Sequence, residues 1–140
     1  MMKIGNQEIV ELIETAIKAR NHAYAPYSKF KVGAAILLKN HTFIIGCNVE
    51  NVSYGLTNCA ERTAMFKMVS EGYNKDDVLA MAIVADTEDP VSPCGACRQV
   101  MAELLNPNTP IYLANTKKMF QKTEVSALLP LGFKGIENAD

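Results

Sequence analysis

Several features of common protein classes are missing from this sequence. The longest uninterrupted apolar run, residues 78–85, falls far short of the roughly 20 residues that a membrane-spanning helix needs. The net charge of -1 gives no excess of positive charge, which disfavours a protein that holds polymeric nucleic acid. We therefore expect no membrane partner and no nucleic-acid polymer, whereas a single nucleoside remains allowed.

Cysteine is also scarce. Four cysteines in 140 residues are too few for a disulfide scaffold. The amino terminus reaches acidic Glu8 before any hydrophobic run and does not resemble a secretory signal, so we expect a cytoplasmic protein. In a reducing compartment, a Cys-x-x-Cys pair such as Cys94 and Cys97 indicates metal or redox chemistry.

What the sequence contains is typical of one α/β domain. Apolar residues make up 49% of the chain and charged residues 21%, which excludes intrinsic disorder, and we interpret residues 1–140 as a single domain. Apolar spacing predicts helices over 9–20, 58–71, 95–104 and 123–129, the last capped by Thr123. It predicts strands over 31–38, 42–49, 78–85, 111–114 and 119–122, of which the first two form a hairpin. We therefore expect a three-layer α/β/α fold with a mixed central sheet of undetermined strand order.

Two short segments contain most of the chemically active side chains, residues 57–64 (Thr-Asn-Cys-Ala-Glu-Arg-Thr-Ala) and residues 93–98 (Pro-Cys-Gly-Ala-Cys-Arg). Each opens a predicted helix, so Cys59, Cys94 and Cys97 lie in first turns, where free N–H groups and the helix dipole favour the thiolate. A zinc ion held by three protein ligands keeps a fourth tetrahedral position for water, as catalytic sites do. We predict that these three cysteines bind one zinc ion per subunit.

Glu61 and Arg62, the second and third residues after Cys59, have complementary predicted roles. Glu61 points to a different side of the helix from Cys59, so it can meet a metal-activated water without ligating the metal, as a general acid and base does. Three thiolates leave the site formally negative, and Arg62 is the best placed cation to donate hydrogen bonds to sulfur. We expect the loss of Arg62 to weaken catalysis more than zinc binding.

Three simpler interpretations account for parts of this pattern. Asn58 and Glu61 have the spacing of an ordinary helix-capping pair. A Cys-x-x-Cys pair also occurs as a redox centre on thioredoxin-like domains, although this leaves Cys59 unexplained. A closed zinc site with Cys47 as the fourth ligand would make the protein a non-catalytic, zinc-stabilised interaction domain, but Cys47 lies in an apolar strand, where an inert thiol is more common.

The wider pattern resembles a known enzyme family. Residues 26–35 (Pro-Tyr-Ser-Lys-Phe-Lys-Val-Gly-Ala-Ala), 46–51 (Gly-Cys-Asn-Val-Glu-Asn), 59–64 and 93–97 are similar, in this order, to the small zinc-dependent cytidine deaminases of the homotetrameric type. The likeness extends from the first predicted helix to about Phe133. The resemblance implies that Cys59, Cys94 and Cys97 bind zinc and that Glu61 carries protons.

The resemblance also implies the residues that bind the substrate. Asn48 and Glu50, with Val49 between them, would hold the ribose hydroxyls, and their side chains point the same way on a strand. Phe30 would pack against the pyrimidine. The main chain at Ala60 and near Pro93 would bind the edge of the base, and Phe133 would reach into the site of a neighbouring subunit.

The implied reaction is the hydrolytic deamination of cytidine and 2′-deoxycytidine to uridine and 2′-deoxyuridine in pyrimidine salvage. A zinc-activated water would attack C4 of the base, Glu61 would protonate N3, and ammonia would leave. The sequence has no Gly-rich phosphate loop, and Glu50 would repel a phosphate, so free nucleosides are favoured over nucleotides. A related aminopyrimidine nucleoside antibiotic of the blasticidin type is the alternative substrate.

Overall fold

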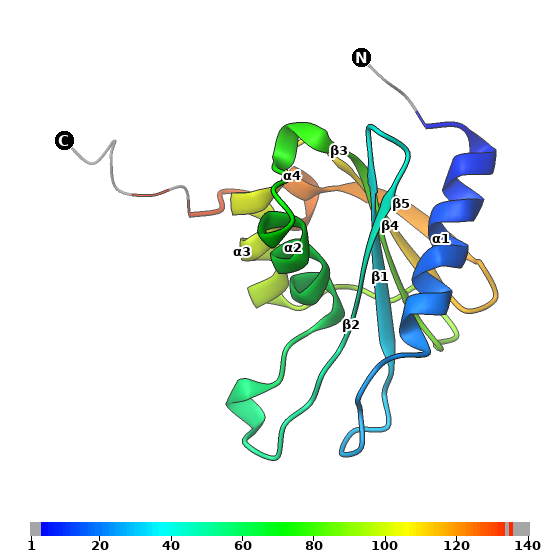
Figure 1. Ribbon diagram of the computed structural model, residues 1–140, viewed down its shortest axis with the longest axis vertical. Helices are drawn as coiled ribbons and strands as arrows, with labels where there is room; N and C mark the ends of the chain where they lie inside the picture. The colour runs from blue at the N-terminus through cyan, green and yellow to red at the C-terminus, as the bar shows by residue number, and fades with distance from the viewer. Residues whose placement is uncertain (1–3, 134, 136–140) are drawn as a thin grey trace.

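The computed structural model describes residues 4–133 and 135, and its centre is a five-stranded mixed sheet with helices on both faces (Figure 1). The strands are β1 (Val32–Leu38), β2 (Phe43–Cys47), β3 (Val78–Ala85), β4 (Pro110–Asn115) and β5 (Phe120–Glu124). The helices are α1 (Asn6–Arg20), α2 (Ala60–Ser70), α3 (Gly95–Leu104) and α4 (Val125–Leu128), with short 3-10 helices at Tyr54–Leu56 and Lys75–Asp77. The predicted three-layer α/β/α fold with a mixed sheet is confirmed.

The order of the strands across the sheet is β2-β1-β3-β4-β5. Strand β1 pairs antiparallel with both β2 and β3, β3 pairs parallel with β4, and β5 pairs antiparallel with β4. The predicted hairpin is therefore present, and the single parallel pair is joined by the crossover that contains α3. No helix in the described part of the chain is long and apolar enough to cross a membrane.

Alternating side chains of the sheet form two separate cores. In β1, Ala34, Ile36 and Leu38 pack with residues of α2, α3 and α4, whereas Ala35 and Leu37 pack with residues of α1. Strand β3 is buried along its whole length, as its continuous apolar run predicts for a strand covered on both faces. Figure 1 shows α1 alone on one face of the sheet and the other helices on the opposite face.

Gly46 lets α2 lie directly against the edge strand β2. A Cβ atom at this position would come within 2.5 Å of the amide nitrogen of Ala64 and 2.6 Å of the carbonyl oxygen of Ala60, which are closer than real Cβ contacts. Only glycine accommodates this approach. The contact involves the first turns of α2, so it determines where the residues at the beginning of that helix lie.

Three predicted helix starts differ from the structure. Helix α1 begins at Asn6, three residues before the predicted start. Helix α2 begins at Ala60 rather than at residue 58, with Cys59 as its N-cap. The prediction that Thr123 caps the last helix is wrong, because Thr123 lies in β5 opposite Ile111 and the helix begins after Glu124. Threonine suits both a cap and a strand, and pairing with β4 decides between them here.

Candidate metal centre and active site

Three cysteine sulfurs meet where α2 and α3 begin. Cys59 and Cys94 are the N-cap residues of these helices, both with extended backbone, and neither side chain caps its own helix. Cys97 follows in the first turn of α3 and is buried. The Sγ atoms of the three residues all lie within 4.8 Å of one another. The fold therefore brings together all three predicted metal ligands from segments 35 residues apart.

The spacing of these sulfurs fits a zinc ion. Zinc–sulfur bonds of about 2.3 Å at tetrahedral angles place two sulfur ligands about 3.8 Å apart. The Sγ atoms of Cys59 and Cys94 are 3.8 Å apart, and those of Cys94 and Cys97 are 3.3 Å apart. Thiolates are soft ligands that select zinc among the common divalent ions. The donor set therefore suits the predicted cofactor, and the Cys59–Cys94 pair already has the separation that zinc requires.

The closed, four-ligand site is not formed. Within residues 4–133 and 135, the cluster contains no fourth His, Cys, Asp or Glu side chain, and Cys47 is not part of it. Cys47 is half-buried at the end of β2, where burial raises the pKa of its thiol. A three-cysteine set leaves one tetrahedral position of a bound zinc ion for water, as in catalytic centres.

Arg62 balances part of the negative charge of the cluster. Its Nη2 atom donates a hydrogen bond of 3.4 Å to Sγ of Cys59, and the contact with that sulfur raises the pKa of the guanidinium. Hydrogen bonding to Cys97, with a further contribution from Arg62, outweighs burial and lowers the pKa of Cys59 to about 5. The pKa of Cys97 rises, because its thiol donates to Cys59 and is buried. Arg62 and the neighbouring thiols therefore favour the thiolate form of Cys59.

Glu61 lies in the first turn of α2 and is only 5% exposed. Burial, followed by the charge of Cys59, raises the pKa of its carboxyl group. The capping pair of Asn58 and Glu61 does not form, because Cys59 is the N-cap and the side chain of Asn58 donates to Oγ1 of Thr63 at 3.1 Å. Helix capping thus fails to explain why a carboxylate is buried beside the cluster.

The segment predicted to bind ribose runs beside the first ligand. Main-chain hydrogen bonds of 2.9 Å in both directions join Val49 to Asn58, the residue before Cys59. On the other side of this segment, the main-chain N–H of Tyr24 donates to the main-chain carbonyl of Asn48, and the main-chain carbonyl of Tyr24 accepts from the main-chain N–H of Glu50. Figure 1 shows the loops that follow α1 and β2 extending together beyond one end of the sheet.

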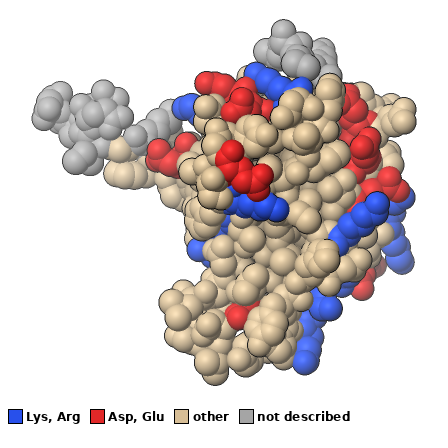
Figure 2. Space-filling model, in the orientation of Figure 1, with Lys and Arg blue, Asp and Glu red and all other residues tan. Residues whose placement is uncertain are grey.

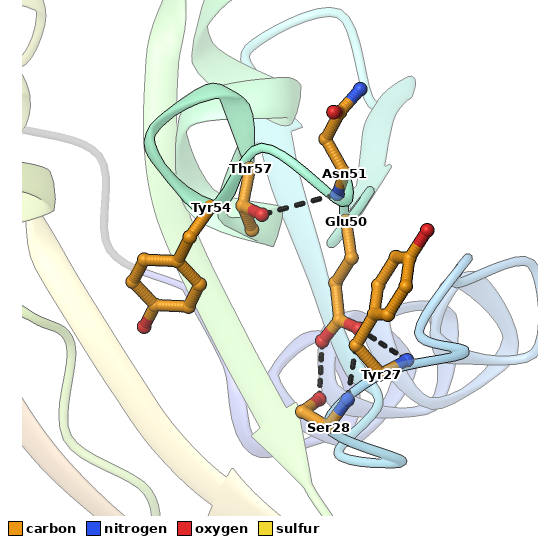
Figure 3. A pocket seen from close by; sticks show the side chains of 6 residues that line it. All are labelled: Tyr27, Ser28, Glu50, Asn51, Tyr54 and Thr57. Atoms are coloured by element: carbon orange, nitrogen blue, oxygen red, sulfur yellow. Dashed lines mark hydrogen bonds between the residues drawn. The ribbon is translucent and has the colours of Figure 1, made fainter.

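Asn48 and Glu50 make different contacts in this segment. The amide of Asn48 is buried, accepts from the main-chain N–H of Val32 and donates to the carbonyl of Phe30, both at 2.8 Å. The carboxylate of Glu50 accepts from the main-chain N–H groups of Tyr27 and Ser28 at 3.0 Å and from the Ser28 hydroxyl (Figure 3). These bonds, those of Ser28 first, lower the pKa of Glu50. Asn48 therefore orders the backbone next to Phe30, and Glu50 is an ionised acceptor.

A pocket of about 260 Å³ lies beside the Glu50 carboxylate. Its lining, shown in Figure 3, consists of Tyr27, Ser28, Glu50, Asn51, Tyr54 and Thr57, and includes none of the three cysteines. Of these residues, sequence reasoning assigned a role only to Glu50. The resemblance motif contained Tyr27 and Ser28, but their contacts with Glu50 span more than 20 positions and no local pattern shows them.

The remaining predicted residues lie near this region or at the end of the described chain. Phe30 is 42% exposed and Val49 is 44% exposed, so both side chains are accessible. Ala60 is fully buried as the first residue of α2. Phe133 is 67% exposed, and its carbonyl accepts a hydrogen bond of 3.0 Å from the side chain of Gln99 in α3.

Residues 6–113 match the sequence profile of the cytidine and deoxycytidylate deaminase zinc-binding region. The chain belongs to this deaminase family. The match covers α1 to β4 and includes all three cysteines. Membership in a zinc-binding family agrees with the metal that the cysteine cluster fits.

Relatives within the family are similar over most of their length. The chain is 60% identical over 122 residues to a cytidine deaminase of Halalkalibacterium halodurans, covering 87% of this chain and 91% of the relative. It is 55% identical over 126 residues to a cytidine deaminase of Sporosarcina psychrophila, with coverage of 90% and 91%. The crystal structure of cytidine deaminase from Burkholderia pseudomallei has a TM-score of 0.87 at 48% identity, covering 93% of this chain and 100% of that one.

Replacement of single cysteines tests the ligand set. We expect Cys94→Ala to lower the zinc content of the purified protein well below one ion per chain, because the cluster loses a thiolate. We expect the control, Cys47→Ala, to keep one ion per chain, since Cys47 is outside the cluster. Elemental analysis of both variants measures this, and loss of zinc from Cys47→Ala would contradict the three-cysteine site.

Proposed function

We propose that this protein hydrolytically deaminates cytidine and 2′-deoxycytidine to uridine and 2′-deoxyuridine, releasing ammonia. The observation that carries this proposal is the open cluster of three cysteines beside a buried glutamate. The 60% identity to a cytidine deaminase supports the same conclusion and favours cytidine over an antibiotic of the blasticidin type. Water and the nucleoside are the only reactants that this chemistry needs.

Cys59, Cys94 and Cys97 would hold the metal, which when bound lowers the pKa of a water molecule and makes it nucleophilic at neutral pH. Glu61 would accept one proton from the attacking water and deliver it to N3 of the base, then take the second proton from the oxygen that has bonded to C4 and deliver it to the leaving amino group. Its burial holds the carboxyl group in one place and away from bulk water. Arg62 and the amino-terminal ends of α2 and α3 offset the charge of the thiolates.

The segment Asn48–Val49–Glu50 and Phe30 would bind the nucleoside. Asn48 has one N–H left after its two main-chain bonds, and the Glu50 carboxylate has acceptor capacity beyond its three bonds, so both can meet ribose hydroxyls. The accessible ring of Phe30 is attached to the backbone that Asn48 holds and suits packing against a pyrimidine. The main chain of Ala60 and near Pro93 would bind the edge of the base.

We also propose a homotetramer located in the cytoplasm. The loop after β2 exposes large apolar side chains, with Val52 81%, Tyr54 88% and Leu56 70% accessible. Figure 2 shows that the lobe formed by this loop carries few charged side chains, as in surfaces that contact other proteins. The exposed Phe133 would reach a neighbouring site in such an assembly. Light scattering that gives the mass of one 15.3 kDa chain would contradict the tetramer.

Replacement of Glu61 tests the reaction. We expect Glu61→Gln to keep one zinc ion per chain and to lower kcat at least about 100-fold, because proton transfer loses its carrier. Ammonia release from cytidine and zinc content are measured on the same purified sample. The control, Glu71→Gln, changes an exposed glutamate just beyond α2 and retains full turnover. Unsubstituted protein with bound zinc that released no ammonia from cytidine would contradict the proposed function.

The same two measurements test Arg62. We expect Arg62→Gln to lower kcat by a larger factor than it lowers zinc affinity, because the uncompensated thiolates make a bound water less acidic. Lys67→Gln, an exposed change further along α2, is the control and leaves both quantities unchanged. An equal loss of zinc affinity and of kcat would show that Arg62 only retains the metal.

Replacement of Glu50 tests the ribose assignment. We expect Glu50→Ala to raise KM for cytidine about 10-fold or more, because a hydrogen bond to a charged acceptor is lost. Ser28→Ala is the matched control, since it removes one bond that holds Glu50 and leaves the carboxylate in place. Steady-state ammonia release measures both variants, and unchanged turnover of cytidine by Glu50→Ala would show that the ribose is bound elsewhere.

A further inference from the structure

We propose that Arg98 is a positioning residue of the metal centre, which fixes the loop carrying Cys94 to the end of α4. This proposal rests on the zinc site of the proposed function. Unlike Arg62, which donates a hydrogen bond to a cysteine sulfur, Arg98 acts on the loop before Cys94. Arg98 lies in the first part of α3, directly after the buried ligand Cys97.

The guanidinium of Arg98 makes a hydrogen bond from each of its three nitrogens. Nε donates to the carbonyl of Pro93 at 2.9 Å, and Nη2 donates to the hydroxyl of Ser92 at 2.7 Å. Nη1 donates to the carbonyl of Leu128 at 3.0 Å, at the last residue of α4. One side chain thus joins α3 to the two residues before Cys94 and to a helix 30 positions further along the chain.

These bonds control the position of Cys94 more than that of the other two ligands. Cys97 is buried inside α3 and Cys59 is hydrogen-bonded by Arg62, whereas Cys94 is exposed and follows a loop. Proline has no N–H group, so Pro93 cannot attach this loop through a main-chain donor, and its carbonyl is held by Arg98 instead. Metal–ligand distances tolerate errors of only about 0.2 Å, so a loop that shifts weakens the Cys94 ligand.

The shape of the side chain matters as well as its charge. The three acceptors of Arg98 lie around a planar fork whose nitrogens have fixed directions. A lysine has one nitrogen at the end of a flexible chain and cannot reach the Pro93 and Leu128 carbonyls in this arrangement. Arg98→Lys is therefore expected to behave like a loss of the side chain.

Zinc release from the holoenzyme tests this role with a readout other than activity. The rate of zinc transfer to the chelator 4-(2-pyridylazo)resorcinol is measured for each variant at the same interval below its own unfolding midpoint, which removes differences in global stability. We expect Arg98→Met and Arg98→Lys to release zinc about 10- to 100-fold faster than the unsubstituted protein. Ser92→Ala removes one of the three bonds and is expected to release zinc faster by a smaller factor.

Arg20→Met is the matched control. Nε of Arg20 also donates to a main-chain carbonyl, that of Lys31, at 3.1 Å, but it does so at the end of α1 on the opposite face of the sheet. We expect its zinc release within about twofold of the unsubstituted protein.

The outcomes separate this proposal from the proposed function. Unchanged zinc release by Arg98→Met, or full restoration by lysine, would overturn the positioning role while leaving the deaminase intact. Unsubstituted protein that bound no zinc would instead overturn the site itself. If Arg98→Met does not fold, Arg98→Lys and Ser92→Ala decide the question. Zinc release by Arg98→Lys that is no faster than release by Ser92→Ala would overturn the proposal.

Discussion

The concentration of negative charge at the cysteine cluster is the constraint on which the rest of this structure depends. Three sulfur atoms within 4.8 Å of one another cannot all become thiolates without nearby positive charge. The structure supplies it from the amino-terminal ends of two helices and from Arg62, and a bound divalent ion would supply the remainder. The contacts that hold α2 and α3 in place therefore also keep the cysteine cluster and the positive charges beside it in position.

The fold meets this constraint through packing on one face of the sheet. Gly46 allows the first turns of α2 to lie against β2, and Met101 of α3 belongs to the same apolar core, together with residues of β3 and β4. Main-chain pairing of Val49 with Asn58 then attaches the proposed substrate segment to the residue before Cys59. The proposed metal ligands, proton carrier and substrate segment thus share one support, which favours accurate geometry in the site.

Much of the site was predictable because its chemistry is concentrated in short motifs. Residues 57–64 and 93–98 contain the three cysteines and Glu61, and a three-residue spacing at a helix start directs Cys94 and Cys97 to the same place. The contacts of Asn48 and Glu50 were not predictable, because their partners lie 16 to 23 positions away. Thr123 shows the same limit for secondary structure, since pairing across β4 overrides its local preference.

The sequence by itself determined the kinds of elements, their order along the chain and the residue types suited to binding zinc, because periodicity and ligand chemistry are local properties. Only the tertiary structure decided the strand order, the exclusion of Cys47 from the cluster and the contacts of Arg98 with the loop before Cys94 and with α4. These three features depend on which distant segments pack together. That packing is determined by the burial of both apolar faces of the sheet, which involves residues from the whole described chain.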